Sequence, residues 1–225
     1  MISHKYKCVF LHIPKTAGTS IERYLRKLDS NIPEKTPRQR GFTKFLNEFG
    51  EKYFVFTFVR NPYERLKSAW RWGEMMYRKY KDQIPYFYKS HSLDFQEYVR
   101  MTTDLEYRSK NSTKWSLYDD YHTLPQVAFI PDLNNNIYFG DKITKNFRTD
   151  FIGEYENLND HFDIVLDFIG SSADETKENV FEHVFKSKKD ISGDCEYDAS
   201  LQNMVCDYYI EDFNKFNYDK NSIIL

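Results

Sequence analysis

The sequence has few cysteines. The three present, Cys8, Cys195 and Cys206, include no CxxC pair. An odd and sparse set of this kind is typical of free thiols in a reducing compartment, and it excludes a small protein stapled by a disulfide framework. Cys8 lies within an apolar run and is expected to be buried. A bridge between Cys195 and Cys206 stays open as an alternative.

Long apolar runs are also missing. No stretch approaches the roughly 18 apolar residues that read as a membrane span. Residues 1–7 lack the apolar region of a signal peptide, and Lys15 interrupts the apolar run that follows them. These absences predict no membrane span and, by default, a cytoplasmic location. A trimmed lumenal domain stays open as an alternative.

Glycine is scarce, with 8 residues, and neither common glycine-rich nucleotide motif is present. The Walker A pattern GxxxxGK[ST] places glycines before its lysine, and the dinucleotide pattern GxGxxG is missing as well. The sequence also has no cluster of His, Cys and Asp with the spacing of metal ligands, so no metal site is predicted.

Charge is present in both signs but is unevenly distributed. The first 81 residues hold 18 Lys or Arg and 7 Asp or Glu, whereas residues 82–225 hold 14 and 27. A basic first third indicates a localised anion site, unless the fold mixes the two regions in space. The overall pI of about 6.3 is low for a nucleic-acid-binding protein, so no nucleic-acid partner is predicted.

Hydrophobic patterns predict an α/β fold with a parallel sheet. Tyr6–Ile13 and Tyr53–Val59 are short, β-prone runs, and a helical pattern follows each at once. Thr19 or Ser20 is expected to cap the first helix. The second helix is predicted over Tyr63–Tyr80. The start of this second helix is indicated by Asn61 as the cap and Pro62 at the first helical position. In the first helix, the expected apolar stripe is Ile21, Leu25 and Leu28.

The rest of the chain predicts further helices and one strand. Residues 90–125 are expected to form helices joined by polar loops. The other predicted elements are a short helix at Phe42–Phe49, a strand at Phe151–Gly153, a helix at Leu158–Ile169 and a long final helix at Glu196–Phe216. No segment has the composition of a linker, so one domain over residues 1–225 is predicted.

The loop after the first predicted strand has the composition of a phosphate-binding turn. A loop that enters a helix exposes backbone N–H groups, and the helix N-terminus adds about half a positive charge. Gly18 permits close approach or positive φ. Thr19 and Ser20 offer hydroxyl groups, and Lys15 supplies a mobile charge. The alternative is an ordinary strand-to-helix turn with a surface lysine.

The second strand ends in another anion-binding candidate. Arg60 follows the strand, and Ser68 lies two turns into the next helix. Ligands of open α/β sheets bind beyond the C-terminal ends of the strands, so neighbouring strands would place Arg60 beside the first loop. A guanidinium next to a serine hydroxyl can hold a second phosphate. Alternatively, Arg60 pairs with Glu64 and Ser68 only packs.

Together, HIPKTAGTS (His12–Ser20) and FVRNPYERLKSAW (Phe58–Trp70) resemble the two cofactor motifs of sulfotransferases that use 3′-phosphoadenosine 5′-phosphosulfate (PAPS). The likeness is closest to the carbohydrate sulfotransferases of the chondroitin 4-O and uronyl 2-O type, and it covers nearly the whole chain. It continues in LDFQEYV (Leu93–Val99), YHTLPQ (Tyr121–Gln126), DFIGEYENLNDHFDIVLDFIG (Asp150–Gly170) and YYIEDFNKFNY (Tyr208–Tyr218).

This resemblance implies a sulfotransferase fold related to nucleotide kinases, with a central parallel sheet flanked by helices. It implies transfer of a sulfuryl group from PAPS to an acceptor hydroxyl, with a carbohydrate as the favoured acceptor and adenosine 3′,5′-bisphosphate (PAP) as the product. Arg60 and Ser68 would hold the 3′-phosphate. The residues implied around the 5′-phosphosulfate are Lys15, Thr16, Ala17, Gly18, Thr19 and Ser20, with Lys15 stabilising the charge that develops on the phosphate.

The acceptor hydroxyl needs a general base, and here the chain departs from its relatives. The uronyl 2-O enzymes use a histidine between the two cofactor motifs, and this chain has none between Ile13 and Ser90. His122 is the first candidate, the alternative being a histidine that holds a loop in place. Glu48 and Glu51 stay open as carboxylate bases.

The remaining histidines and charged side chains are mostly expected to have structural or surface roles. His12 is expected to support the first loop, and His91 to lie exposed beside a helix start. His161 and His183 are expected at the surface, and Glu156 is expected to be structural. The basic run Lys186, Lys188 and Lys189 is predicted to be a solvated face or a lid.

Two rival functions stay open. A nucleotide kinase-like phosphotransferase would bind ATP with Mg²⁺, although the missing glycine-rich loop counts against it. A non-catalytic PAPS- or PAP-binding module would keep both phosphate motifs without a base. A glycan, a lipid-linked sugar and a small metabolite all stay open as the acceptor.

Overall fold

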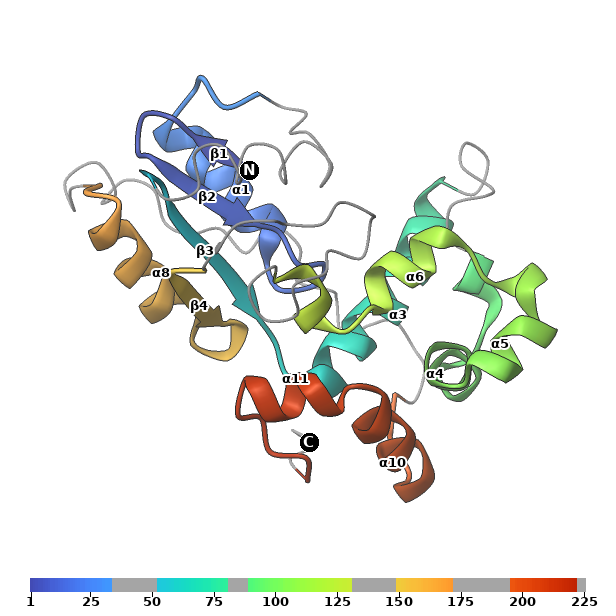
Figure 1. The fold of residues 1–225 in the computed structure, drawn as a ribbon. Coiled ribbons are helices and arrows are strands. Elements are labelled where there is room, and N and C mark those ends of the chain that lie inside the picture. Colours follow the sequence, from blue (N-terminus) through green and yellow to red (C-terminus); the bar gives the residue numbers. More distant parts are fainter. Residues whose placement is uncertain (34–51, 81–88, 131–148, 172–194, 222–225) are drawn as a thin grey trace. The chain divides into compact units, whose positions relative to one another are not determined.

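The computed structural model describes residues 1–33, 52–80, 89–130, 149–171 and 195–221, which form two compact units (Figure 1). The first unit takes its residues from Met1–Arg60 and Gln126–Phe185, and the second from Asn61–Pro125 and Lys186–Leu225. The chain therefore leaves the first unit after Arg60 and re-enters it at Gln126. The single domain predicted over residues 1–225 stays a prediction, and each unit is described by itself.

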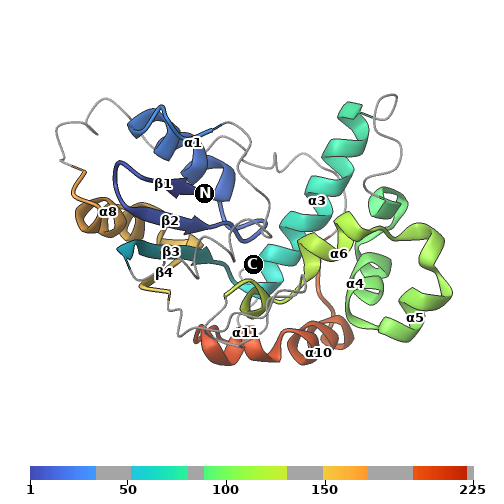
Figure 2. The ribbon, with the colours of Figure 1, turned by 45° about the horizontal axis from the view of Figure 1, so that its top comes forward.

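The first unit is built on a mixed sheet with the strand order β1-β2-β3-β4 (Figure 2). Strands β2, β3 and β4 are parallel, and β1 pairs antiparallel with β2 at the edge. The α/β fold with central parallel strands is confirmed, whereas the two-residue β1 was not predicted. The strands are β1 (Ile2–Ser3), β2 (Cys8–Leu11), β3 (Phe54–Val59) and β4 (Phe151–Glu154).

Alternating side chains give the sheet one aromatic and one aliphatic face. Helices α1 (Gly18–Leu28) and α8 (Leu158–Phe168) both pack against the aromatic face. The predicted stripe of α1 is buried, and burial of each such side chain contributes about 1.5–3 kcal/mol. The aromatic face carries Phe10, Phe56 and Phe58, and the aliphatic face carries Val9, Leu11 and Val55.

Strand β4 is followed directly by a turn and then by a helix. Gly153 leaves room for the ring of Phe58, since a Cβ atom at this position would lie 2.4 Å from Phe58 Cε1. The 3₁₀ turn η5 (Tyr155–Asn157) follows, and α8 begins immediately after it. The strand and helix predicted in this region are confirmed to within one residue at each end.

The second unit is helical. The helices predicted within residues 90–125 are confirmed, and Asn61 caps α3 as predicted, its Oδ1 accepting from Tyr63 N at 3.0 Å. Short 3₁₀ turns η2 (Lys89–Ser92) and η3 (Ser112–Lys114) lie between these helices, and η4 (Gln126–Phe129) follows α6 in the chain and belongs to the first unit. The α-helices are α3 (Pro62–Tyr80), α4 (Phe95–Thr103), α5 (Leu105–Lys110), α6 (Leu117–Thr123), α10 (Ala199–Tyr208) and α11 (Ile210–Lys215).

The single final helix predicted over Glu196–Phe216 is wrong. The helix starts only after Asp198, whose side chain accepts a hydrogen bond from Leu201 N at 2.8 Å. It is interrupted at Tyr209, where φ is −101° and ψ is 22°. Tyr209 is buried and donates its hydroxyl to a carbonyl of α6, so tertiary contacts set the break.

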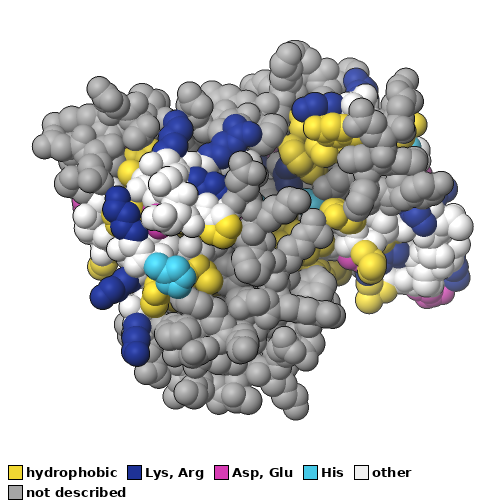
Figure 3. Space-filling model, turned by 90° about the horizontal axis from the view of Figure 1, so that it is seen from above, with side chains coloured by type: hydrophobic (Ala, Val, Ile, Leu, Met, Phe, Trp, Pro, Cys, Tyr) yellow, Lys and Arg dark blue, Asp and Glu magenta, His cyan; other side chains and the backbone are white. Residues whose placement is uncertain are grey.

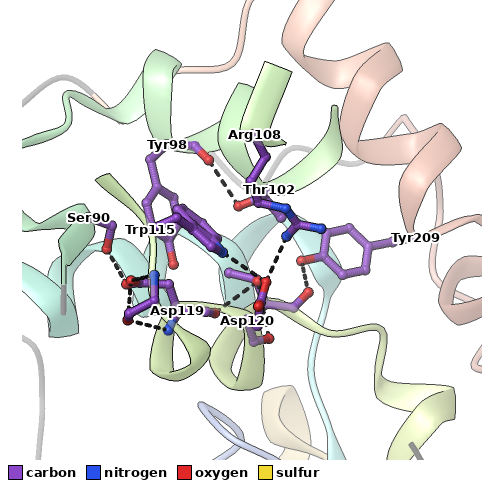
Figure 4. Close-up of polar contacts among 10 residues, drawn as sticks. Ser90, Tyr98, Thr102, Arg108, Trp115, Asp119, Asp120 and Tyr209 are labelled. Atoms are coloured by element: carbon purple, nitrogen blue, oxygen red, sulfur yellow. Dashed lines mark hydrogen bonds and ion pairs between the residues drawn. The ribbon is translucent and has the colours of Figure 1, made fainter. Parts of the chain in front are cut away.

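A polar network fixes α6 within the second unit (Figure 4). The buried carboxylate of Asp119 accepts from Ser90 Oγ and from Ser116 Oγ, the residue that caps the helix. Asp120 accepts from Arg108 Nη1 at 2.9 Å and from Trp115 Nε1 at 2.8 Å. Burial raises the pKa of Asp119. Both carboxylates are therefore used structurally, and they hold the helix that carries His122.

The remaining predictions concern the cysteines, membrane spans and residues outside the described ranges. Cys8 is buried as expected, and no disulfide joins Cys195 and Cys206. Among the residues that the structure describes, no helix is both long and apolar enough to cross a membrane. The helix predicted at Phe42–Phe49, Glu48, Glu51, His183 and the lysine run at 186–189 lie outside the described residues.

Candidate functional site

The loop between β2 and α1 has an unusual backbone. Lys15 and Ala17 adopt left-handed conformations, with φ of 72° and 67°. Such conformations cost non-glycine residues about 1–3 kcal/mol each and cluster at functional sites. Left-handed residues in a turn can direct successive N–H groups toward one point, which is the geometry of an anion nest.

The predicted cap of this helix is wrong. Helix α1 begins at Gly18, and Ala17 is the N-cap without a side-chain hydrogen bond. The left-handed Ala17 turns its own carbonyl toward the helix, where it accepts from Ser20 N at 2.9 Å and from Ile21 N at 3.2 Å. Thr19 and Ser20 therefore lie inside the first turn rather than before it.

The N-terminus of α1 has the features of an anion-binding site. Helix geometry gives the N–H groups of Gly18 and Thr19 no intrahelical acceptor. The first turn carries no acidic residue, so no carboxylate there offsets the positive end of the helix dipole. Thr16 is buried and donates its hydroxyl to Ile13 O at 2.9 Å, so its side chain holds the loop. Lys15 is half-buried beside these donors.

The side chain of His12 packs against the start of α1 and supports this loop. Its ring lies against Gly18, where a Cβ atom would come within 2.2 Å of His12 Nε2. Its Nδ1 pairs with Glu22 Oε1 at 2.9 Å. Burial tends to raise the pKa of Glu22, but the contact with His12 and the charge of Arg26 together lower it. Gly18 is thus required for space, and the expectation that His12 supports the loop is confirmed.

Substituting Gly18 by alanine is expected to destabilise the protein by about 1–3 kcal/mol, the usual cost of overpacking, because the new methyl group displaces the His12 ring. Chemical denaturation of the single variant measures this free energy of unfolding. In a His12→Ala background the ring is gone, so the same substitution should cost much less. An undiminished cost in the double variant would show that the ring is not what Gly18 accommodates.

Arg60 lies beside this loop, as the neighbouring parallel strands predicted. Its Nη1 is 3.5 Å from Lys15 O, and its guanidinium lies 4.0 Å from the centroid of the Tyr155 ring. The proposed alternative partner, Glu64, forms an ion pair with Lys67 at 3.1 Å. Within the first unit, the guanidinium of Arg60 therefore lies against the backbone of the loop that carries Lys15 and leads into α1.

The sequence of the chain matches one family of enzymes. The model of the sulfotransferase family matches residues 1–219, which includes both units. The chain belongs to the sulfotransferase family. No curated protein and no solved structure gives a significant match. Enzymes of this family generally use PAPS, and the cationic loop of this sulfotransferase suits the anionic groups of such a donor.

Charge on the surface formed by residues 1–33 favours the same class of ligand. Within residues 1–33 the only two acidic residues, Glu22 and Asp29, are mostly or fully buried. On the face of the molecule shown in Figure 3, dark blue Lys and Arg side chains are more prominent than magenta Asp and Glu side chains. Residues 1–33 therefore carry exposed basic side chains but no fully exposed acidic side chain. The exposed basic residues there are Lys5, Lys7, Arg23 and Lys27.

The second unit of the sulfotransferase carries the other two predicted site residues. Ser68 is half-buried on α3, and His122 is half-buried near the end of α6. His122 Nδ1 lies 2.7 Å from Tyr118 O. A carbonyl only accepts, so Nδ1 carries the proton and the lone pair of the neutral ring is on Nε2. Buried Arg65 donates to the carbonyl of His122 at 3.3 Å and anchors this residue.

The other histidines of the described residues have structural contacts. His91 is half-buried rather than exposed, and it stacks on Tyr77 with ring centroids 3.5 Å apart. His161 is half-buried rather than fully exposed, and its Nδ1 accepts from Glu154 N at 2.8 Å. The described residues contain no cluster of three or more His, Cys, Asp or Glu that could hold a metal ion.

Two residues beside Arg60 were missed as site candidates. Gln126 and Tyr155 both contact Arg60, although 66 and 95 residues separate them from it in sequence. Both belong to segments already noted for their likeness to sulfotransferases, YHTLPQ and DFIGEYENL. That likeness was the available signal, but it does not say which residue each side chain touches.

Proposed function

We propose that this sulfotransferase transfers a sulfuryl group from PAPS to an acceptor hydroxyl on a carbohydrate, in line, and releases PAP. The observation that carries the proposal is the contact of the Arg60 guanidinium with the backbone of Lys15, in the loop that leads into an α1 N-terminus without acidic residues in its first turn. A nucleotide with phosphate groups at both its 5′ and 3′ positions requires two cationic contacts.

In this proposal the first loop acts on the donor. PAPS, when bound, supplies an activated sulfuryl group on its 5′-phosphate. Lys15 and the N–H groups at the start of α1 bind that phosphate and stabilise the negative charge that grows there as the S–O bond breaks. Preorganised donors of this kind are effective because they need no reorientation during the reaction. Thr16 contributes its backbone, and Thr19 offers a hydroxyl from the first turn.

The 3′-phosphate is assigned to Arg60 and Ser68. Arginine presents a planar set of donors that matches phosphate oxygens in pairs, which a lysine cannot reproduce. Charge-assisted hydrogen bonds of this kind contribute about 1.5–3 kcal/mol each. The assignment of Ser68 rests on the FVRNPYERLKSAW motif alone.

His122 is assigned as the general base. Its tautomer, set by Tyr118 O, presents Nε2 as the proton acceptor. Arg65 holds the backbone of His122, so the ring is carried by a fixed residue rather than by a loose loop. A positioned base of this kind contributes roughly 10²- to 10⁴-fold to a rate.

The cofactor class is tested by calorimetric titration with PAP and, separately, with ATP and Mg²⁺. PAP is expected to bind without metal, and ATP is expected to bind at least about tenfold more weakly, a difference of roughly 1.4 kcal/mol. Tighter binding of ATP than of PAP would favour a kinase-like phosphotransferase. Transfer of ³⁵S from labelled PAPS to a panel of oligosaccharides then separates an enzyme from a non-catalytic PAP-binding module.

A further inference from the structure

The backbone of Arg60 is held by one buried side chain. Gln126 Oε1 accepts from Arg60 N at 2.8 Å, and Gln126 Nε2 donates to Arg60 O at 2.9 Å. Gln126 has no solvent exposure. Because the two hydrogen bonds grip the peptide groups on both sides of one Cα atom, they fix the direction in which the arginine side chain leaves the strand.

The guanidinium group is held by a second residue. Arg60 Cζ lies 4.0 Å from the centroid of the Tyr155 ring, well within the roughly 6 Å range of cation–π contacts. A stacked guanidinium keeps its N–H groups in the plane of the cation, where they point outward at its edge. The contact with the face of the Tyr155 ring therefore restrains the rotation of a long side chain.

We propose that Gln126 and Tyr155 are positioning residues which hold Arg60 ready for a 3′-phosphate, and that they thereby set the preference for a 3′-phosphorylated nucleotide. The inference rests on the proposed assignment of Arg60 to the 3′-phosphate. Gln126 fixes the origin of the side chain, and Tyr155 fixes its end. Neither contact involves the N–H groups at the start of α1, so the larger effect is expected at the 3′ position.

Tyr155 provides the cleaner test, because it is half-buried in a surface turn. In the Tyr155→Leu variant the π face is lost, and PAP affinity is expected to fall roughly 3- to 30-fold, the range of cation–π contributions. The affinity for adenosine 5′-monophosphate, which lacks the 3′-phosphate, should change by less than about twofold. Both dissociation constants are measured by calorimetry on the full chain.

Two control variants separate positioning from general damage. Tyr155→Phe keeps the ring, so PAP affinity should stay close to that of the wild type. Tyr53→Leu removes another tyrosine of the same unit, which precedes the opposite end of β3 and pairs with His4 at 2.7 Å, and it should leave both affinities unchanged. Equal losses of PAP and monophosphate affinity in Tyr155→Leu would show a purely structural role and overturn the inference.

Gln126→Glu tests the other contact with little change in size. A carboxylate still accepts from Arg60 N but cannot donate to Arg60 O, so PAP affinity should fall while the monophosphate affinity is retained. If the wild type prefers PAP over the monophosphate and both Tyr155→Leu and Gln126→Glu keep that preference, the positioning role alone is overturned. A wild type that binds PAP no better than the monophosphate would overturn the 3′-phosphate assignment, and this inference with it.

Discussion

Replacing Lys15 by alanine is expected to lower kcat about 100- to 1,000-fold, the usual effect of removing one donor that stabilises developing charge. Lys15 occupies a left-handed position in the loop before α1, and its side chain is half-buried there. Its charge opposes the negative charge that grows on the leaving phosphate, so the loss falls mainly on the transition state. The fold should survive, because alanine takes the same backbone conformation that Ala17 already adopts two residues later.

The measurement is steady-state kinetics with labelled PAPS and the oligosaccharide that the wild type sulfates fastest. Lys15→Arg keeps the charge and should retain more activity than Lys15→Ala. Lys27→Ala removes an exposed lysine at the far end of α1 and serves as the matched control. A Lys15→Ala enzyme with raised KM and unchanged kcat would mean that the lysine binds donor and transition state equally, which contradicts a catalytic role.

The elements around this loop could be predicted because local pattern and tertiary structure agree there. Two β-prone runs followed by helical patterns predicted β2, α1, β3 and α3, and parallel pairing then predicted that Arg60 would lie beside the loop. Asn61 and Pro62 specify the start of α3 through their own chemistry, independently of what packs around them. Such features need no knowledge of distant residues.

The wrong predictions concern features that are set by contacts with residues distant in the sequence. Nothing in the composition of PKTAGTS indicates that Ala17 is left-handed, and this conformation moves the helix start to Gly18. The pattern of the last helix is continuous through Tyr209, and the break follows from burial of that side chain. Likewise, the pattern allowed two reasons for Gly18, and only the position of the His12 ring decides between them.

The contacts of Arg60 show the same limit at the candidate site. The motif singles out Arg60, because an arginine at the end of a parallel strand is a recognisable anion ligand. Gln126 and Tyr155 have no such signature, since glutamine and tyrosine are common at buried and half-buried positions. Their importance comes from the 2.8, 2.9 and 4.0 Å contacts that folding creates. Residues that act on a ligand are thus easier to predict than residues that hold them in place.

Replacing His122 by alanine is expected to lower kcat roughly 10²- to 10⁴-fold if the imidazole is the general base, with PAP affinity unchanged. The competing explanation is that His122 only holds the C-terminal part of α6, through the contact of Nδ1 with Tyr118 O. Alanine removes both the base and this contact, so the single variant does not separate the two explanations.

Asparagine separates them. The amide of His122→Asn can donate to Tyr118 O in place of Nδ1, but it cannot accept a proton from the acceptor hydroxyl. A base role predicts that the asparagine and alanine enzymes are equally slow. Near-normal turnover in the asparagine enzyme would assign His122 to the helix and direct the search for the base to Glu48 and Glu51.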